Sequence, residues 1–423
     1  MKKKIGVHEL APGMYLSELD RPWRETPFPF QGFEVSSYDE IEWVRHNCSY
    51  VYIDVILGDD VKHHPTSAVN ESAGRLRVKE QGRSRIDILG NARLVEHQDQ
   101  TPFEKEINTA REIDLQARDL MSEMMSNARL GKTLNAAGAQ DVVSGLTKSI
   151  LRNPDALVCW THLRDKDNYT ALHCLRVSIL ALAFGRHLGF EEEQLNIVGI
   201  GGLMGDVGMS RVPKEILNKP NSLTTEEYQL VKSHVPFGVE IVKNTKGIPP
   251  EAVELVQYHH EWYDGRGYMK GLKGDTIGLY GLMGGIIDWY DAVTSERPYR
   301  RAIAPTQALT RMYEQRARIF HPTLVELFIQ CMGIYPIGSV VEFDTQEVGV
   351  VLTTDRAQRL RPKVAVVLSR DKKPYLSSTR IVELGGDAEQ PSTQALKIEH
   401  VLPAGAYGIN PTDYLLPGDF KAA

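Results

Sequence analysis

Cysteine is scarce in this chain of 423 residues, which contains four, and no two of them form a CxxC pair. A disulfide framework is therefore not expected, and a reducing compartment is indicated. No apolar run approaches the roughly 18 residues of a membrane span, and the charged opening Met1-Lys2-Lys3-Lys4 has no apolar segment behind it. The net charge of −6 argues against a broad basic surface for nucleic-acid polymers. These absences predict a cytoplasmic protein with neither a signal peptide nor a membrane segment.

The length exceeds what one compact core usually holds, so two or three domains are expected. Residues 1–65 form a predicted β-rich module. Its run from Tyr50 to Ile56 alternates poorly between apolar and polar residues, which predicts a strand buried on both faces. Residues 58–100 are polar and lack periodicity, which indicates a loop or linker.

From Phe103 to about Phe328, apolar residues recur at spacings of three and four, which predicts helices throughout. After residue 336, short β-branched runs separated by turns predict a C-terminal module of three or four strands. The expected fold is multidomain α+β, with a central all-α helical bundle between two small β modules. The predicted boundaries are 1–65 for the N-terminal module, 66–135 for a linker and connecting helix, 136–335 for the bundle and 337–415 for the C-terminal module.

Potential metal ligands recur along the predicted helices as four histidines and two aspartates. They are His173, Asp206, His234, His259, His260 and Asp288. Asp288 follows two isoleucines, which indicates burial, and Asp291 is its neighbour on the same helical face. Mixed imidazole and carboxylate ligands suit Fe, Mn, Zn or Ni and not Ca. The set predicts a site for one or two such metals, which would activate water and stabilise a phosphoryl displacement.

Two of these residues also have ordinary structural explanations when taken alone. His173 has Val177, Leu180 and Phe184 on its helical face, as a packed core histidine would. Asp206 fits a cap for the segment that follows it, although a charge in that apolar, glycine-rich setting is costly unless it is paired or bound to a cation.

The other histidines leave the same choice open. His234 is predicted on the helix that Thr224 opens with a T-x-x-E capping box, and it fits a surface position near the end of that helix. His259 and His260 end a helix that begins at Pro250, where the helix dipole alone favours imidazole. The glycine-rich turn that follows them predicts a close approach of backbone to whatever these histidines hold.

The stretch from about 160 to 330 resembles an HD-GYP domain, a branch of the HD superfamily of metal phosphohydrolases, over about 40% of the chain. Its motifs occur in one order with regular spacing. They are Tyr169-Thr170-Ala171-Leu172-His173, Gly205-Asp206-Val207-Gly208, Pro213 to Pro220, His259-His260-Glu261, Asp264-Gly265-Arg266-Gly267-Tyr268 and Asp288 to Arg300. The opening from Ile5 to Tyr15 also resembles the accessory domain that precedes some HD-GYP domains.

The resemblance implies metal-dependent hydrolysis of cyclic di-GMP to linear pGpG or GMP. It implies that the four histidines and two aspartates named above are the ligand positions, with Asp206 as the catalytic residue that bridges two metals. It places Asp264, Gly265, Gly267 and Tyr268 against substrate or a partner GGDEF domain. Arg297 and Arg300 keep positive charge available for phosphate, and a homodimer is left open.

The chain departs from the family pattern at several positions. The changes are Gly205 for the histidine of the His-Asp pair, Met209 for a lysine, Met269 for the proline of GYP, Trp262 for a basic residue, Leu282 for an arginine and the displaced Pro236. Without the imidazole at Gly205, one metal keeps four ligands and the second keeps only His173, Asp206 and Asp288, so the second position is predicted to be weak. Losing that metal and the lysine would remove stabilisation worth several kcal/mol.

Three hypotheses follow. The first is an active, slow cyclic di-GMP phosphodiesterase. The second is an inactive relative that binds the nucleotide or a partner protein as a sensor or scaffold. The third is an HD-type phosphohydrolase for another nucleotide.

Overall fold

The protein is described from a computed structural model. The described residues are 2–21, 26, 32–35, 38–55, 58–59, 94–161, 169–219, 221–295, 302–353, 362–375, 380–384, 396–403 and 405–414. The chain divides into two units, residues 1–87 and 88–423. Most of the predicted linker over 58–100 lies outside the described residues, and the four predicted domain boundaries remain predictions.

The N-terminal unit contains a small antiparallel sheet in the strand order β1-β4-β2-β3. Its elements are β1 (Lys2–Gly6), the short helix η1 (Val7–Glu9), β2 (Tyr15–Leu19), β3 (Phe33–Glu34), α1 (Tyr38–Asn47) and β4 (Tyr50–Asp54). Burial alternates along β4: Val51 and Ile53 are buried, whereas Tyr50 and Tyr52 are partly exposed. The prediction that this strand is buried on both faces is therefore wrong. Tyrosine has a polar hydroxyl and can lie on the solvent-facing side of a strand, and the Lys4 ammonium group lies over the ring of Tyr50.

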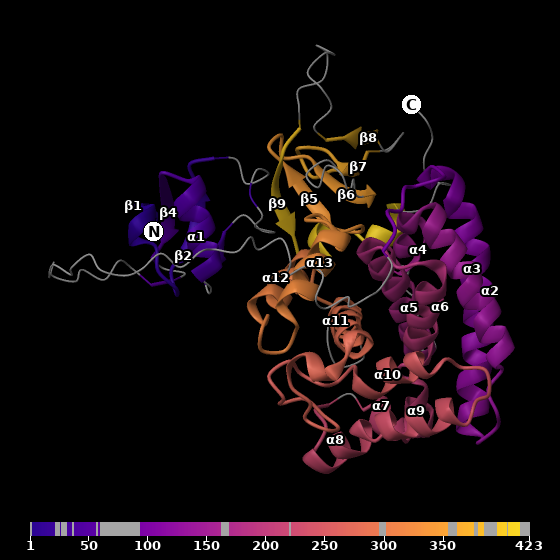
Figure 1. Cartoon of the computed structure of the whole chain (residues 1–423). Helices are drawn as coiled ribbons and strands as arrows, with labels where there is room; N and C mark the ends of the chain where they lie inside the picture. The colour runs from indigo at the N-terminus through magenta and orange to yellow at the C-terminus, as the bar shows by residue number, and fades with distance from the viewer. Residues whose placement is uncertain are drawn as a thin grey trace, which may run out of the picture. The chain divides into compact units, whose positions relative to one another are not determined.

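The second unit begins with the helical bundle. Its helices are α2 (Phe103–Arg129), α3 (Ala136–Arg152), α4 (Pro154–Thr161), α5 (Tyr169–Leu188), α6 (Glu192–Met204), η3 (Val207–Arg211), α7 (Lys214–Leu217), α8 (Thr225–Lys232), α9 (His234–Lys243), α10 (Pro250–Tyr258), η4 (Gly274–Ile277), α11 (Leu279–Thr294), α12 (Pro305–Glu314) and α13 (Pro322–Met332). The long helix α2 lies beside α3, and α5 packs against α6 (Figure 1). Helix α10 contacts α6, α9 and α11, so it joins the parts of the bundle that carry the candidate ligands.

Helix α5 has the length and composition of a membrane-spanning helix over Thr170–Leu188. However, 89% of its most apolar window is buried inside the bundle, as in the core helix of a water-soluble protein. Its apolar character is therefore explained by its central packing against α6, α11 and α13.

A second antiparallel sheet follows the bundle, in the order β8-β7-β6-β5-β9. Its strands are β5 (Val340–Phe343), β6 (Val348–Thr353), β7 (Lys363–Leu368), β8 (Arg380–Glu383) and β9 (Ile398–Leu402). Val341, Phe343, Val351, Val364 and Val366 form its apolar cluster. The described residues thus contain five strands here, more than the three or four predicted, because the two edge strands β8 and β9 are short, contain charged or imidazole side chains among their apolar residues, and bury none of their residues. The predicted fold class, a central helical bundle between two small β modules, is confirmed.

Candidate metal centre

The six candidate ligands come from five places in the bundle and converge. His173 lies on α5, Asp206 between α6 and η3, His234 at the start of α9, His259 and His260 just after α10, and Asp288 on α11. They form two groups, in each of which one ligand atom per residue lies within 4.8 Å of the others. One group is Asp206, His234, His259 and His260, and the other is His173, Asp206 and Asp288. Asp206 belongs to both.

Asp206 follows Gly205, the residue that caps the C-terminal end of α6. It occupies the N-cap position of η3, yet its side chain makes no capping hydrogen bond, so the explanation of this residue as a helix cap is wrong. Two residues later, a Cβ atom on Gly208 would lie 1.9 Å from the carbonyl oxygen of His234. Only glycine permits this approach of η3 to α9, which brings Asp206 to His234.

His234 does not lie on the helix that Thr224 opens. The predicted capping box exists, with the Glu227 N–H donating to Thr224 Oγ1 over 3.3 Å, but α8 ends at Lys232 and His234 begins α9. Pro236 explains the break, because its ring would clash with the carbonyl of Lys232 in a continuous helix. His234 is fully buried, so the surface explanation for it is wrong as well.

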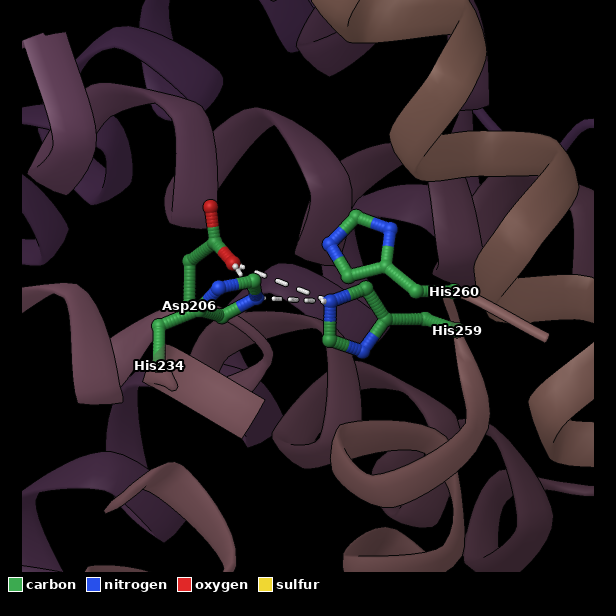
Figure 2. Close-up of side chains that lie close together, drawn as sticks. All are labelled: Asp206, His234, His259 and His260. Atoms are coloured by element: carbon green, nitrogen blue, oxygen red, sulfur yellow. Dashed lines mark hydrogen bonds and ion pairs between the residues drawn. The ribbon is translucent and has the colours of Figure 1, made fainter. Parts of the chain in front are cut away.

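The hydrogen bonds of His234 and His259 fix which ring nitrogen carries the proton. The Nδ1–H of His234 donates to the Val231 carbonyl oxygen over 2.6 Å, and that of His259 donates to Val256 over 3.0 Å. A carbonyl can only accept, so the neutral imidazoles have lone pairs on Nε2. The two Nε2 atoms lie 3.5 Å apart and both face Asp206 (Figure 2). The Oδ1 atom of Asp206 is 3.2 Å from His234 Nε2 and 3.7 Å from His259 Nε2.

This arrangement fits a metal ion better than it fits a hydrogen-bond network. Oδ1 of Asp206 is buried and, within the described part of the chain, has no hydrogen-bond partner of acceptable geometry. When both imidazoles are neutral, three electron-pair donors face a common point, which is the arrangement that a divalent cation requires. Burial of such a carboxylate is costly unless a cation offsets it.

His260 completes the first group from the other side. Its ring stacks on Tyr268, with ring centroids 4.6 Å apart, and lies 4.2 Å from the ring of His259. Burial and the neighbouring charge of His259 hold the pKa of His260 well below its usual range. The imidazole is therefore neutral near pH 7, as a metal ligand must be.

The second group forms around the other oxygen of Asp206. His173 Nε2 lies 3.4 Å from Asp206 Oδ2 and 2.9 Å from Asp288 Oδ1. Burial lowers the pKa of His173, but its hydrogen bonds to Asp288 and Asp291 more than offset this and raise the pKa to about 10. For the Asp206 carboxylate the directions are reversed. Burial raises its pKa, but the charge of His234 and the contacts with the other histidines outweigh burial and bring the pKa well below the usual range. The carboxylates of the pocket therefore stabilise a positive charge, whether it is carried by a protonated histidine or by a bound cation.

The sequence did not indicate a role for two residues of this region, Asp291 and Arg176. Asp291 Oδ2 accepts a hydrogen bond from His173 Nδ1 over 2.6 Å, and Arg176 donates to both oxygens of Asp291 over 2.6 and 3.0 Å. The three-residue spacing between Asp288 and Asp291 was the available signal, but it does not show which residue each carboxylate meets.

The loop after α10 is held against the histidines. The N–H of Tyr268 donates to the His260 carbonyl oxygen over 3.0 Å, and a Cβ atom on Gly267 would lie 2.2 Å from the nitrogen of Trp262. The buried carboxylate of Glu261 accepts from the N–H groups of Lys270 and Leu272 over 2.6 and 3.0 Å. The predicted tight turn is therefore present, and it depends on glycine at position 267.

Of the residues that the resemblance assigns to substrate or partner contact, some lie beside the candidate ligands and others do not. Tyr268 lies beside the cluster, whereas Asp264 pairs with Arg266 of its own loop and Gly265 forms a turn with φ of +86°. Arg297 and Arg300 lie outside the described residues.

A small cavity lies next to the second group. Gly205, Asp206, His173, Cys174 and Asp288 are among the residues that line it. A Cβ atom on Gly205 would have its nearest neighbour at 3.5 Å, an ordinary contact, and the backbone there is helical. The position could therefore carry a Cβ atom without moving the atoms around it.

Comparison with known proteins gives two family matches. The HD domain family matches residues 154–324, and a domain of unknown function matches residues 2–139. A cyclic di-GMP phosphodiesterase of Pseudomonas aeruginosa is 32% identical over 426 aligned residues, which cover 100% of this chain and 97% of that protein. A response-regulator cyclic di-GMP phosphodiesterase of Xanthomonas campestris is 32% identical over 166 residues, 39% of this chain and 44% of that protein. A 3′3′-cGAMP-specific phosphodiesterase of Vibrio cholerae is 32% identical over 162 residues, 38% of this chain and 31% of that protein.

Proposed function

Because this chain belongs to the HD-GYP family of HD-domain phosphodiesterases, we propose that it hydrolyses cyclic di-GMP to linear pGpG or GMP at a metal centre in its helical bundle. The observation that carries the proposal is the position of Asp206, whose Oδ1 faces His234 and His259 while its Oδ2 faces His173. One carboxylate between two groups of ligand atoms suits a bridge between two ions. The full-length similarity to a cyclic di-GMP phosphodiesterase supports the substrate.

We assign the ligands by group. Asp206, His234, His259 and His260 would hold one ion, and His173, Asp206 and Asp288 would hold a second. The mixture of imidazole and carboxylate suits Fe, Mn, Zn or Ni. When bound, such ions activate water and neutralise charge on a phosphodiester undergoing displacement. With Gly205 where the family has histidine, the second position has three ligands from the chain and is the weaker one.

The chain's own residues prepare the centre before an ion binds. Val231 and Val256 hold the protons of His234 and His259 on Nδ1, so that each Nε2 atom is free to coordinate. Tyr268 covers His260 and limits the access of solvent to that imidazole. Fixing these groups in advance lowers the reorganisation that ion and substrate binding would otherwise require.

Two other functions remain candidates for specific reasons. The Vibrio cholerae relative is specific for 3′3′-cGAMP, which favours a test of that nucleotide beside cyclic di-GMP. The glycine at position 205 and the methionine at position 209 favour a chain that binds nucleotide with little turnover. We also propose a cytoplasmic location and a homodimer. We further propose that a GGDEF-domain partner binds at the 264–268 loop, because the neighbouring Met269 is an apolar side chain that is 49% exposed.

The test is metal analysis of the purified chain, followed by hydrolysis assays with cyclic di-GMP and 3′3′-cGAMP in the presence of Mn²⁺ or Fe²⁺. We expect turnover of cyclic di-GMP that Asp206→Ala abolishes. Asp141→Ala, a change at an exposed aspartate on α3, is the matched control and should leave turnover unchanged. Turnover of only 3′3′-cGAMP would correct the substrate. Tight nucleotide binding with no turnover of either compound would favour the sensor function.

A further inference from the structure

The Nδ1 atom of His173 is hydrogen-bonded to the carboxylate of Asp291, which is not one of the candidate ligands. Nδ1 lies 2.6 Å from Asp291 Oδ2, and the side chains of the two residues are 3% and 4% exposed. A buried carboxylate at this distance accepts a strong hydrogen bond and holds the proton on Nδ1. Nε2 is thereby directed towards Asp206 and Asp288.

Asp291 is itself held in place by other side chains. Arg176 Nε and an Arg176 terminal nitrogen donate to its two oxygens over 2.6 and 3.0 Å, and Ser295 Oγ donates over 3.4 Å. The guanidinium binds the carboxylate as a fork, which fixes its plane. Arg176 also lies near the buried Asp114 of α2: burial raises the pKa of Asp114, and the charges of Arg118 and Arg176 lower it in part. The positive charge of Arg176 therefore acts on a second buried carboxylate, although its hydrogen bonds go to Asp291.

In the other ligand group, backbone carbonyls take the place of such a carboxylate, since they accept the Nδ1 protons of His234 and His259. His173 lies inside the long helix α5, where the backbone carbonyls are used by the helix itself. A carboxylate partner also makes the coordinating nitrogen more basic than a carbonyl partner does. This difference matters because His173 is the only imidazole of its group.

We infer that Asp291, fixed by Arg176, is the positioning residue that keeps the Nδ1 proton of His173 in place and so maintains the three-ligand metal position despite the glycine at position 205. The inference deepens the proposed function and rests on it for the presence of an ion at that position.

The variant Asp291→Asn tests this directly. It keeps the shape of the side chain but can turn an amide N–H towards His173 Nδ1, which would move the imidazole proton to Nε2, where it blocks coordination. The measurement is titration of the metal-free full-length chain with Mn²⁺ by calorimetry, with chelator competition for the tighter ion. For the wild-type chain we expect two classes of site. Asp291→Asn should weaken the weaker class by about 10- to 100-fold and leave the tighter class unchanged.

A matched control is available elsewhere in the bundle. Glu106 is also a buried carboxylate that accepts two bonds from an arginine, Arg152, and one from Ser149. Glu106→Gln should leave both classes of metal site unchanged, although it removes the same kind of ion pair.

A spectroscopic measurement separates positioning from a general loss of structure. In the Zn²⁺-loaded protein, histidine ¹⁵N spectra should show the His173 proton on Nδ1 in the wild-type chain, with its signal assigned through His173→Gln. That pattern should be lost in Asp291→Asn. If Asp291→Asn does not fold, Arg176→Lys keeps the charge but loses the fork, and it should weaken the same class of site to a smaller extent.

Several results would overturn the inference. They are a wild-type chain that binds a single Mn²⁺ ion, equal losses in both classes of site, an unchanged weaker class in the folded variants, or the same loss in Glu106→Gln. Missing cyclic di-GMP turnover in these preparations would count against the proposed function alone, because the titrations contain no nucleotide.

Discussion

The Oδ1 atom of Asp206 lies 3.2 Å from Nε2 of His234. In the neutral imidazole this nitrogen has a lone pair, because the proton lies on Nδ1, which donates to the Val231 carbonyl oxygen. Oδ2 of the same carboxylate turns to His173, 3.4 Å away. One side chain therefore serves two groups whose imidazoles come from different helices. The groups can be tested separately, because each contains histidines that the other lacks.

Replacing one histidine at a time should remove one ion at a time. His234→Gln should abolish the tighter class of metal site, since it removes one of four ligands whose lone pairs converge. His173→Gln should abolish the weaker class and leave the tighter one. Metal analysis after dialysis, together with Mn²⁺ titration, measures both. Loss of both ions in His173→Gln would show that the two groups do not bind independently.

The stability of the metal-free chain should depend on pH through His173. Its pKa is raised from 6.5 to about 10, so the stabilisation is complete below pH 6.5 and is lost as the pH rises through 10. The histidine contacts that outweigh burial lower the pKa values of Asp206 and Asp288 below 3.8, so their contribution is present above that pH and is lost as the pH falls. The low pKa of His260 removes stability as the pH falls below 6.5, so thermal unfolding in chelator should give the highest Tm near pH 6.5.

The control for this prediction is His173→Gln, which cannot titrate. Its Tm should fall less than that of the wild-type chain between pH 6.5 and 10. Equal alkaline losses in the two proteins would assign the effect to other groups.

The sequence predicted much of the helical bundle because the spacing of its apolar residues is regular. The predicted helical start at Phe103 is where α2 begins, and the capping box at Thr224 is present. The break after Lys232 was missed, although Pro236 supplies its physical cause. Helix α1 was missed too, because it lies among aromatic and β-branched residues that favour strands.

Contacts between distant residues were harder to predict. The motifs of a known family identified the candidate ligands, and the structure brings all six together. No pattern in the sequence links His173 to Asp291 across 118 positions, or Arg176 to the same carboxylate across 115. Such pairings depend on how α5 packs against α11, which local spacing does not determine.

The loop after α10 should tolerate no side chain at position 267. A Cβ atom there would lie 2.2 Å from the Trp262 nitrogen and 2.5 Å from the Glu261 Cα, both of them backbone atoms that cannot simply rotate away. Gly267→Ala should therefore displace Tyr268 from His260 and lower both Tm and turnover. Gly145→Ala is the control: its Cβ atom would meet only Ile113 at 3.7 Å, inside helix α3. The control should raise stability by about 0.5–1 kcal/mol, and equal effects of the two variants would contradict the proposed close approach.

Restoring an imidazole at position 205 should strengthen the weaker metal position. The backbone of Gly205 is helical, the nearest atom to a new Cβ would be 3.5 Å away, and the position lines the cavity beside His173 and Asp288. Gly205→His should therefore fold, tighten the second Mn²⁺ site and raise turnover of cyclic di-GMP by at least about tenfold, which needs only about 1.4 kcal/mol of added transition-state stabilisation. Gly205→Ala separates the effect of the side chain from that of the backbone, since alanine removes flexibility without adding a ligand. An Mn²⁺ affinity equal in Gly205→His and Gly205→Ala would show that the missing imidazole is not what limits the second position.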